Sequence, residues 1–130
     1  MNILKGYFSS LQNEGDVLSV KVDVLGVEFS VLMLDFSSFD FNGELELIFK
    51  EHELCFANLG ANLSVENCFE ARICRIKKGR ILWHIFFKFK HFELGSLIDA
   101  KKGEKLDLKL GEKRLCFIKA NDITLRKASV

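Results

Sequence analysis

Apolar and polar residues alternate along much of the chain, and this period of two constrains the fold more than any other feature. In segment 17–25, three valines face one side of an extended chain while Lys21 and Asp23 face the other. The pattern recurs in three further segments, 44–49, 71–76 and 105–110. Such alternation is typical of antiparallel strands with one buried face. The sequence therefore predicts a protein built from sheets.

Turn-forming residues separate these runs. The chain has no proline, so its turns rely on 9 glycines and on Asn, Asp and Ser. Turns are expected at 13–15, 25–26, 42–43, 78–79, 102–103 and 111. Helix is scarce, since only segments 36–41 and 94–102 offer about one turn each, and neither has an apolar stripe. Short strands at this spacing predict a small barrel or sandwich.

Composition excludes several classes of protein. With 130 residues, the chain forms one domain or two small ones that share a core. The hydrophobic fraction of 48% excludes intrinsic disorder, and a net charge of +1 argues against a general DNA binder. The N-terminus has no signal-peptide pattern, and no window approaches the roughly 18 apolar residues of a membrane span. We therefore expect a cytoplasmic protein that does not enter a membrane.

Motifs for catalysis or metal binding are missing from the sequence. The four cysteines form no Cys-x-x-Cys pair, and no histidine lies at zinc-finger spacing. We expect reduced, mostly buried thiols and no metal held directly by protein ligands. The sequence has no nucleophile turn, P-loop or Gly-x-Gly-x-x-Gly motif. The protein is therefore not expected to be an enzyme.

An internal repeat organises the whole chain. Segment 2–11 aligns with segment 67–76, so that Asn2 lies over Asn67. Segment 43–50 aligns with segment 111–119 when one insertion is allowed. Each copy holds about 60 residues and about five strands, which is marginal alone but reasonable as half of a pair.

The repeat predicts an all-β fold of two tandem OB-like five-stranded barrels with at most short helical turns. The expected domains are residues 1–60 and 61–130, with a linker at 58–63. An open barrel edge and the 13 phenylalanines would need cover, so a homo-oligomer, a dimer or a trimer, is expected.

Four segments of the second copy resemble a known family. They are Ser64-Val-Glu-Asn67, Ile76-Lys-Lys-Gly79, Leu108-Lys-Leu-Gly111 and Phe117-Ile-Lys-Ala-Asn-Asp-Ile-Thr-Leu125. This succession resembles the molybdenum-pterin-binding (Mop) or TOBE domain, which reads approximately Ser-Ala-Arg-Asn, a Gly-containing turn, Leu-x-x-Gly and Ile-Lys-Ala/Ser-x-x-Val. The first copy follows the pattern more loosely, through Asn2, Gly43 and Lys50. With no helix-turn-helix or Walker A sequence, the chain looks like a free-standing di-Mop protein.

The resemblance implies a site for molybdate or tungstate between paired domains or subunits, with no organic cofactor. A tetrahedral dianion offers four acceptor oxygens and no donor, so it needs N–H groups, hydroxyls and cations. At the matching positions Ser64 would supply a hydroxyl, and the backbone at Asn67 and Ala120 would supply N–H donors. Lys119 would supply the charge, and Lys50 is the equivalent cation of the first copy.

The sequence departs from the family pattern at two places. Glu66 stands where the family commonly has Arg, and Asp99 and Lys102 stand in a segment that often carries Thr and Ser ligands. An acid beside a desolvated dianion is unfavourable unless a cation intervenes. Two outcomes follow: Lys102 pairs with Glu66 or Asp99 and rebuilds the pocket, or the usual site no longer binds tightly.

The candidate residues also have ordinary structural interpretations. Lys119 can be a solvent-facing lysine on a terminal strand, and Ser64 can cap the turn that opens the second barrel. Five basic residues near Trp83 suggest a single-stranded nucleic-acid face or, more simply, a solvated strand face; they are Arg72, Arg75, Lys77, Lys78 and Arg80. Under the second interpretation, Phe87 and Phe89 belong to the core.

Three functions remain open. The first is storage, buffering or sensing of molybdate or tungstate for molybdenum homeostasis. The second is a TOBE-type interaction module that binds a molybdate transporter ATPase or a regulator and has lost the oxyanion site. The third and weakest is single-stranded nucleic-acid binding.

Overall fold

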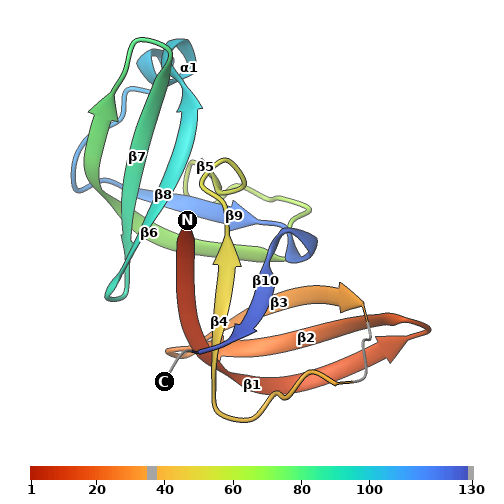
Figure 1. Cartoon of the computed structure of the whole chain (residues 1–130). Helices are drawn as coiled ribbons and strands as arrows, with labels where there is room; N and C mark the ends of the chain where they lie inside the picture. Colours follow the sequence, from red (N-terminus) through yellow and green to blue (C-terminus); the bar gives the residue numbers. More distant parts are fainter. Residues whose placement is uncertain (35–37, 129–130) are drawn as a thin grey trace.

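Two curled five-stranded antiparallel sheets make up the protein (Figure 1). The computed structural model describes residues 1–34 and 38–128. The first sheet has the order β10-β4-β1-β2-β3, with β1 Asn2–Glu14, β2 Val17–Val24, β3 Val27–Leu34, β4 Glu44–Phe49 and β10 Thr124–Lys127. The second has the order β5-β9-β6-β7-β8, with β5 Cys55–Ala57, β6 Asn67–Lys78, β7 Leu82–Phe89, β8 Phe92–Asp99 and β9 Lys113–Ile118.

The all-β prediction with two OB-like sheets is confirmed. Helix is limited to α1 (Ala100–Lys105) and the 3-10 turn η1 (Ala120–Asp122). Of the two segments expected to hold a helical turn, 94–102 is mostly strand β8 and only its end enters α1. Residues 38–41 are not helical, and residues 35–37 lie outside the described part of the chain. No helix among the described residues is long and apolar enough to span a membrane.

Two local predictions in segment 102–110 are wrong. Gly103 is not a turn residue but lies inside α1, where its bare Cα faces the indole ring of Trp83. Segment 105–110 is not a strand, although its leucines alternate with polar residues. The chain cannot stay extended there, because Leu106 caps α1 by donating its N–H to Gly103 O, and Asp107 has a φ of 49°.

The repeat seen in the sequence is also a repeat of structure. Strands β1 to β3 match β6 to β8 at a shift of 65 positions, and β4 matches β9 at a shift of 69. Both long strands carry a β-bulge at the same place, between Phe8 and Ser10 in β1 and between Ile73 and Arg75 in β6. A bulge bends its strand. Each long strand therefore pairs with two different neighbours along its length, β1 with β4 and β2, and β6 with β9 and β7.

The two halves exchange their last strands. β5 follows β4 in the chain but pairs with β9 of the second sheet, where Cys55 lies opposite Phe117. β10 follows β9 but pairs with β4 of the first sheet, where Thr124 lies opposite Ile48. The expected boundary near residue 60 therefore does not separate the two sheets. The division of the chain into two domains, residues 1–60 and 61–130, remains a prediction.

Buried apolar side chains fill the inside of both sheets. The valines of β2 that alternate in the sequence are fully buried, as are Phe29 and Phe49. In the second sheet Phe87 and Phe89 are buried, in agreement with the core interpretation of these residues. Aromatic rings cross between the halves, since Phe29 of β3 packs against Phe69 of β6 and Phe89 of β7. The two sheets therefore share one core.

Side-chain amides join the halves at two equivalent places. Asn67 Oδ1 accepts a hydrogen bond from Ser30 N at 2.7 Å, and its Nδ2 donates to Ser30 O at 2.9 Å. Asn2 makes the same pair with Gly95, at 2.7 and 2.8 Å. Each Asn thus satisfies one backbone N–H and one C=O on β3 or β8, the outermost strand of the opposite sheet.

Candidate functional site

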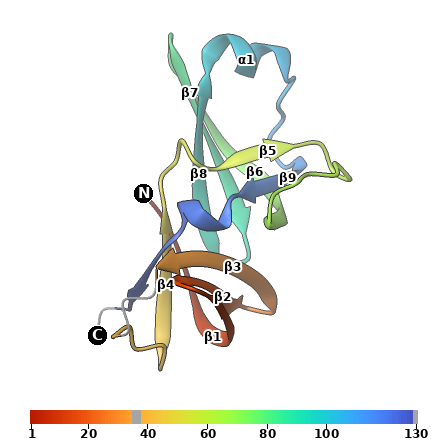
Figure 2. The same cartoon turned by 90° about the vertical axis from the view of Figure 1, so that its right-hand side faces the viewer.

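The candidate residues gather where the two sheets meet, on the segments that follow β4 and β9. These segments, 50–53 and 119–122, are equivalent in the repeat. Figure 2 shows η1 in blue at the level where the sheets meet, well away from α1. Residues of both segments line one cavity of about 470 Å³; its polar lining is Lys50, Glu53, Asn121, Asp122, Thr124 and Arg126.

Ala120 and Glu66 are in direct contact. Ala120 is fully buried, and its N–H donates to Glu66 Oε1 at 2.6 Å. Lys119, an exposed residue with extended backbone, precedes η1, and its carbonyl accepts from Asp122 N at 3.0 Å. The backbone donor expected to hold an oxyanion therefore holds a carboxylate of the chain itself.

Asn67 and Ser64 lie beside this group but differ in their freedom. Asn67 opens β6 opposite Ile118, the residue before Lys119, and both polar atoms of its side chain are bonded to Ser30. Ser64 is exposed in the segment that leads into β6. The structure thus brings Ser64, Asn67, Lys119 and Ala120 to one region, with the Asn67 side chain already used.

Lys102 is not part of this group. It is exposed on α1, which packs against β7 and β8 at the far end of the second sheet from η1 (Figure 1). Asp99 caps α1 by accepting from Lys101 N at 2.8 Å. Of the two alternatives for Lys102, its pairing with Glu66 or Asp99 is not seen among the described residues; both carboxylates accept from backbone N–H groups.

The first half has a different arrangement around Lys50. Glu51 occupies the place of Ala120 in the repeat. Its Oε2 lies 3.2 Å from His84 Nε2, outside hydrogen-bond geometry, and its Oε1 lies 3.4 Å from the Met1 amine. Sequence reasoning missed Glu51 and His84. The shift of 69 positions that relates Lys50 to Lys119 would have pointed to Glu51.

The cysteines are more exposed than predicted. All four are free thiols, and only Cys116 is buried; Cys55, Cys68 and Cys74 are exposed. Cys55 on β5 and Cys68 on β6 both lie opposite Phe117 of β9, so their side chains point to the outer face of the sheet. The Cys116 side chain points inward. Alternation alone did not settle which side of these strands faces the core.

The thiols show no sign of activation. Desolvation raises the pKa of all four thiols above its ordinary value. The carboxylate of Asp122 raises the pKa of Cys55 further, and that of Glu66 raises the pKa of Cys68. Reactive cysteines require a lowered pKa. No cluster of three or more His, Cys, Asp or Glu side chains in residues 1–34 and 38–128 is arranged to hold a metal ion.

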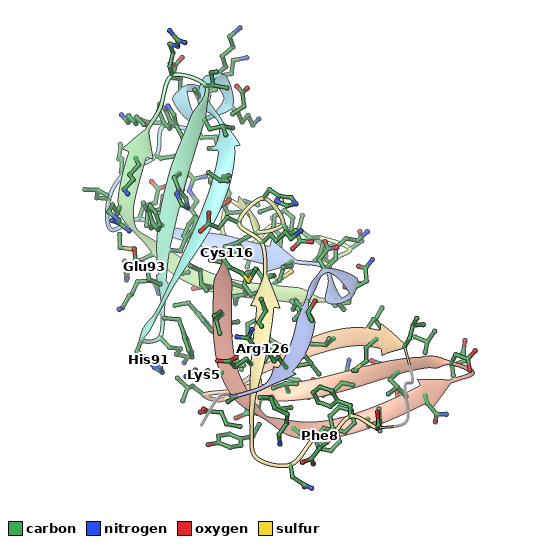
Figure 3. The ribbon with its side chains drawn as sticks, viewed as in Figure 1. Lys5, Phe8, His91, Glu93, Cys116 and Arg126 are labelled. Carbon is green, nitrogen blue, oxygen red and sulfur yellow. The ribbon has the colours of Figure 1, made fainter. Side chains whose placement is uncertain are left out.

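Two of the five basic residues near Trp83, Arg72 and Arg75, have hydrogen-bond partners within the chain. Arg72 donates to Gly111 O at 2.8 Å. Arg75 bonds Glu93 at 2.9 Å and lies 3.9 Å over the Phe86 ring. Figure 3 labels Glu93. Trp83 is buried inside the sheet. A single-strand site needs exposed aromatic faces and free cations, and this face does not combine them.

Comparison with known proteins identifies a structural neighbour. No protein-family model matches the chain, and a comparison with curated proteins finds no match. Among solved structures, the chain is similar to a crystal structure of the cytoplasmic molybdate-binding protein ModG with molybdate bound. The TM-score is 0.87 at 19% sequence identity, covering 98% of this chain and 96% of that chain. The two chains share a fold. At this coverage the similarity extends over both sheets.

Proposed function

We propose that this protein binds a tetrahedral oxyanion, molybdate or tungstate, and serves molybdenum homeostasis in the cytoplasm by storing, buffering or sensing it. The observation that carries the proposal is the match over 98% of the chain, at a TM-score of 0.87, to a protein whose structure holds molybdate. The family resemblance of the second copy supports the same ligand. The function is binding and requires no catalysis and no organic cofactor.

The chemistry of the segments after β4 and β9 supports an anion ligand. Each segment begins with a lysine, Lys50 or Lys119, whose carbonyl closes a tight turn by accepting from the N–H three residues further on. Ser64, two residues before Glu66, is exposed and carries a hydroxyl that suits a ligand oxygen. Cations, hydroxyls and N–H groups are the partners that a doubly charged oxyanion needs. We leave Lys102 out of the proposed site because of its place on α1.

Exposed apolar side chains support the proposal of a homo-oligomer. Val17, Leu32 and Leu34 form a contiguous exposed patch on β2 and β3, in which Val17 lies opposite Leu34. Patches of this kind on an outer strand are commonly covered by another chain. Sedimentation of the purified protein tests this proposal, and a monomer at all concentrations would contradict it.

Calorimetric titration with molybdate, tungstate and sulfate tests the oxyanion proposal. We expect heat and saturation with micromolar molybdate or tungstate. Replacing both Lys50 and Lys119 by Ala is expected to weaken binding by at least about 1.5–3 kcal/mol, the worth of a charge-assisted hydrogen bond. The matched control replaces Lys101 and Lys105, two exposed lysines of α1. Absence of heat with every anion would reject the function.

One observation favours a second candidate, the interaction module of a molybdate transport system. The carboxylate of Glu66 already holds the Ala120 N–H at 2.6 Å, which disfavours a dianion there. If the chain acts this way, a pull-down recovers a transporter ATPase or a regulator in stoichiometric amount, and anion titrations give no heat. We do not propose nucleic-acid binding, because no observation in the structure favours it.

A further inference from the structure

The two halves of the repeat differ at the positions around the proposed site. The shifts that relate the strands place Lys119 over Lys50, so both halves keep the cation. They place Glu66 over Met1, and Ala120 over Glu51. The second half therefore has a carboxylate at a position where the first half has an uncharged side chain.

In the second half, that carboxylate is in place as a ligand. Glu66 Oε1 accepts the Ala120 N–H at 2.6 Å, the short distance of a charge-assisted bond. One N–H has one proton to donate, so an oxyanion at this position must displace the carboxylate. While the carboxylate stays, its negative charge repels a second anion placed within a few ångströms of it.

In the first half, the equivalent region is open. The cavity of about 470 Å³ beside it is lined by Met1, Lys50 and Arg126, and also by Asn121 and Asp122 of the segment after β9. The Glu51 N–H, the counterpart of the donor at Ala120, makes no hydrogen bond to an acceptor in residues 1–34 and 38–128. Arg126 uses Nε and Nη2 on Glu46, which leaves other N–H groups of its guanidinium for a ligand.

The acidic residues near Lys50 have other partners. The Glu53 carboxylate accepts from Lys50 N at 2.8 Å. The Glu51 carboxylate lies 3.2 Å from His84 Nε2, on the side of β7 and β8, and 3.4 Å from the Met1 amine. The carboxylates of Glu53 and Asp122 both remain in the cavity lining, and Lys50 and Arg126 offset their charges.

From this asymmetry we infer that Glu66 is the chain's own anion in the second-half site, and that an external oxyanion binds in the first half alone, next to Lys50. The inference rests on the proposed oxyanion function and makes it specific. One chain then binds one molybdate rather than two. Glu66 sets this number, because it competes for the donor that a second oxyanion would use.

Counting bound anions in variants of the whole chain tests the inference. The measurement is equilibrium dialysis or calorimetry with molybdate itself. We expect one anion per chain for the unaltered protein and none for Lys50→Met. Glu66→Gln keeps the shape of the side chain and removes its charge, so we expect two anions per chain. Adding Lys119→Met to Glu66→Gln should return the number to one.

The matched control is Glu70→Gln, which removes an exposed carboxylate from β6, the strand that follows Glu66. The Glu70 carboxylate pairs with Lys113, with 3.8 Å between Oε1 and Nζ, and it is not one of the residues of the proposed site. The control should bind one anion per chain. A proton NMR spectrum that shows the Ala120 amide signal moved in Glu66→Gln, with the other signals of the sheet retained, confirms that the variant is folded.

The outcomes separate the inference from the function on which it rests. Two anions bound by the unaltered chain, or one still bound by Glu66→Gln, would overturn the role of Glu66 and leave oxyanion binding intact. Binding retained by Lys50→Met would overturn the assignment to the first half. No anion bound by any variant would reject the proposed function itself, and the inference with it.

Discussion

The side chain of Asn67 replaces a missing strand neighbour for Ser30. Its two hydrogen bonds, 2.7 and 2.9 Å long, satisfy a backbone N–H and C=O on the outer strand of the opposite sheet. Asn2 does the same for Gly95. The amide is the side chain that carries a donor and an acceptor in this geometry. The asparagines thus fasten the two sheets together.

Replacing Asn67 by Asp should therefore destabilise the protein. The carboxylate can accept from Ser30 N but cannot donate to Ser30 O, and it is only 2% exposed. Leaving a buried polar group unsatisfied costs about 1–3 kcal/mol, which urea denaturation will detect. The control Asn62→Asp alters an exposed residue of the linker and should change the free energy of unfolding little. Equal stability of the two variants would contradict a fastening role.

A second prediction concerns the ion pair of Arg126 with Glu46. Figure 3 labels Arg126 on β10 and Lys5 on β1, the strands on either side of Glu46. Glu46 is 6% exposed, and Arg126 Nη2 lies 2.7 Å from its Oε1. Arg126→Ala should cost about 2 kcal/mol, less than for a fully buried pair, because the guanidinium is half exposed.

The repeat supplies the compensating change for this pair. In the second half, Leu115 and Ala57 occupy the positions of Glu46 and Arg126. The double variant Glu46→Leu with Arg126→Ala should therefore be more stable than Arg126→Ala alone, because no carboxylate is left buried. Thermal unfolding of the three proteins decides the point. If the double variant unfolds at a lower temperature than Arg126→Ala, the leucine does not fit the first sheet.

A third prediction tests the contact of α1 with the single tryptophan. A Cβ on Gly103 would lie 2.7 Å from Trp83 Cδ2, too close for a methyl group without a shift of the helix. Gly103→Ala should cost about 1–3 kcal/mol by overpacking and should change the tryptophan fluorescence. The neighbouring Lys102→Ala, on the exposed side of α1, should do neither. Unchanged fluorescence in Gly103→Ala would place the helix elsewhere.

A fourth prediction concerns thiol labelling. Cys55, Cys68 and Cys74 are exposed and Cys116 is buried, so three thiols should react in the native protein and the fourth only on unfolding. Because burial raises the pKa of each exposed thiol, its thiolate fraction at neutral pH is below that of a free cysteine. Labelling should be slow at pH 7 and accelerate as the pH rises past the ordinary thiol pKa. Fast labelling of these three thiols at pH 7 would contradict their raised pKa.

The sequence predicts β2, β4 and part of β6 because each has a buried face long enough to show a period of two. The valines of β2 and the leucines of β4 are examples. The same rule failed at Leu106, Leu108 and Leu110, because alternation does not report the positive φ of Asp107. The exchange of β5 and β10 was also beyond the pattern, since strands of 3 and 4 residues do not reveal which neighbour they pair with.

The candidate site was predictable in part for a similar reason. Motif residues close in sequence, such as Lys119 and Ala120, stay together in any fold. The position of Lys102 depended on Gly103, which looks like a turn residue in the sequence but packs on Trp83 in the structure. The role of Glu66 depends on a contact with a residue 54 positions away. No local pattern encodes such a distance.

The crossing of β10 into the first sheet has a consequence for biosynthesis. A ribosome makes β1 to β4 early, yet the strand that completes their sheet lies at Thr124–Lys127. Until those residues leave the exit tunnel, the edge of β4 has no partner and is open to other unfinished chains. Completion of both halves is thus postponed to the same late moment, and with it the closing of the segments after β4 and β9 around any anion.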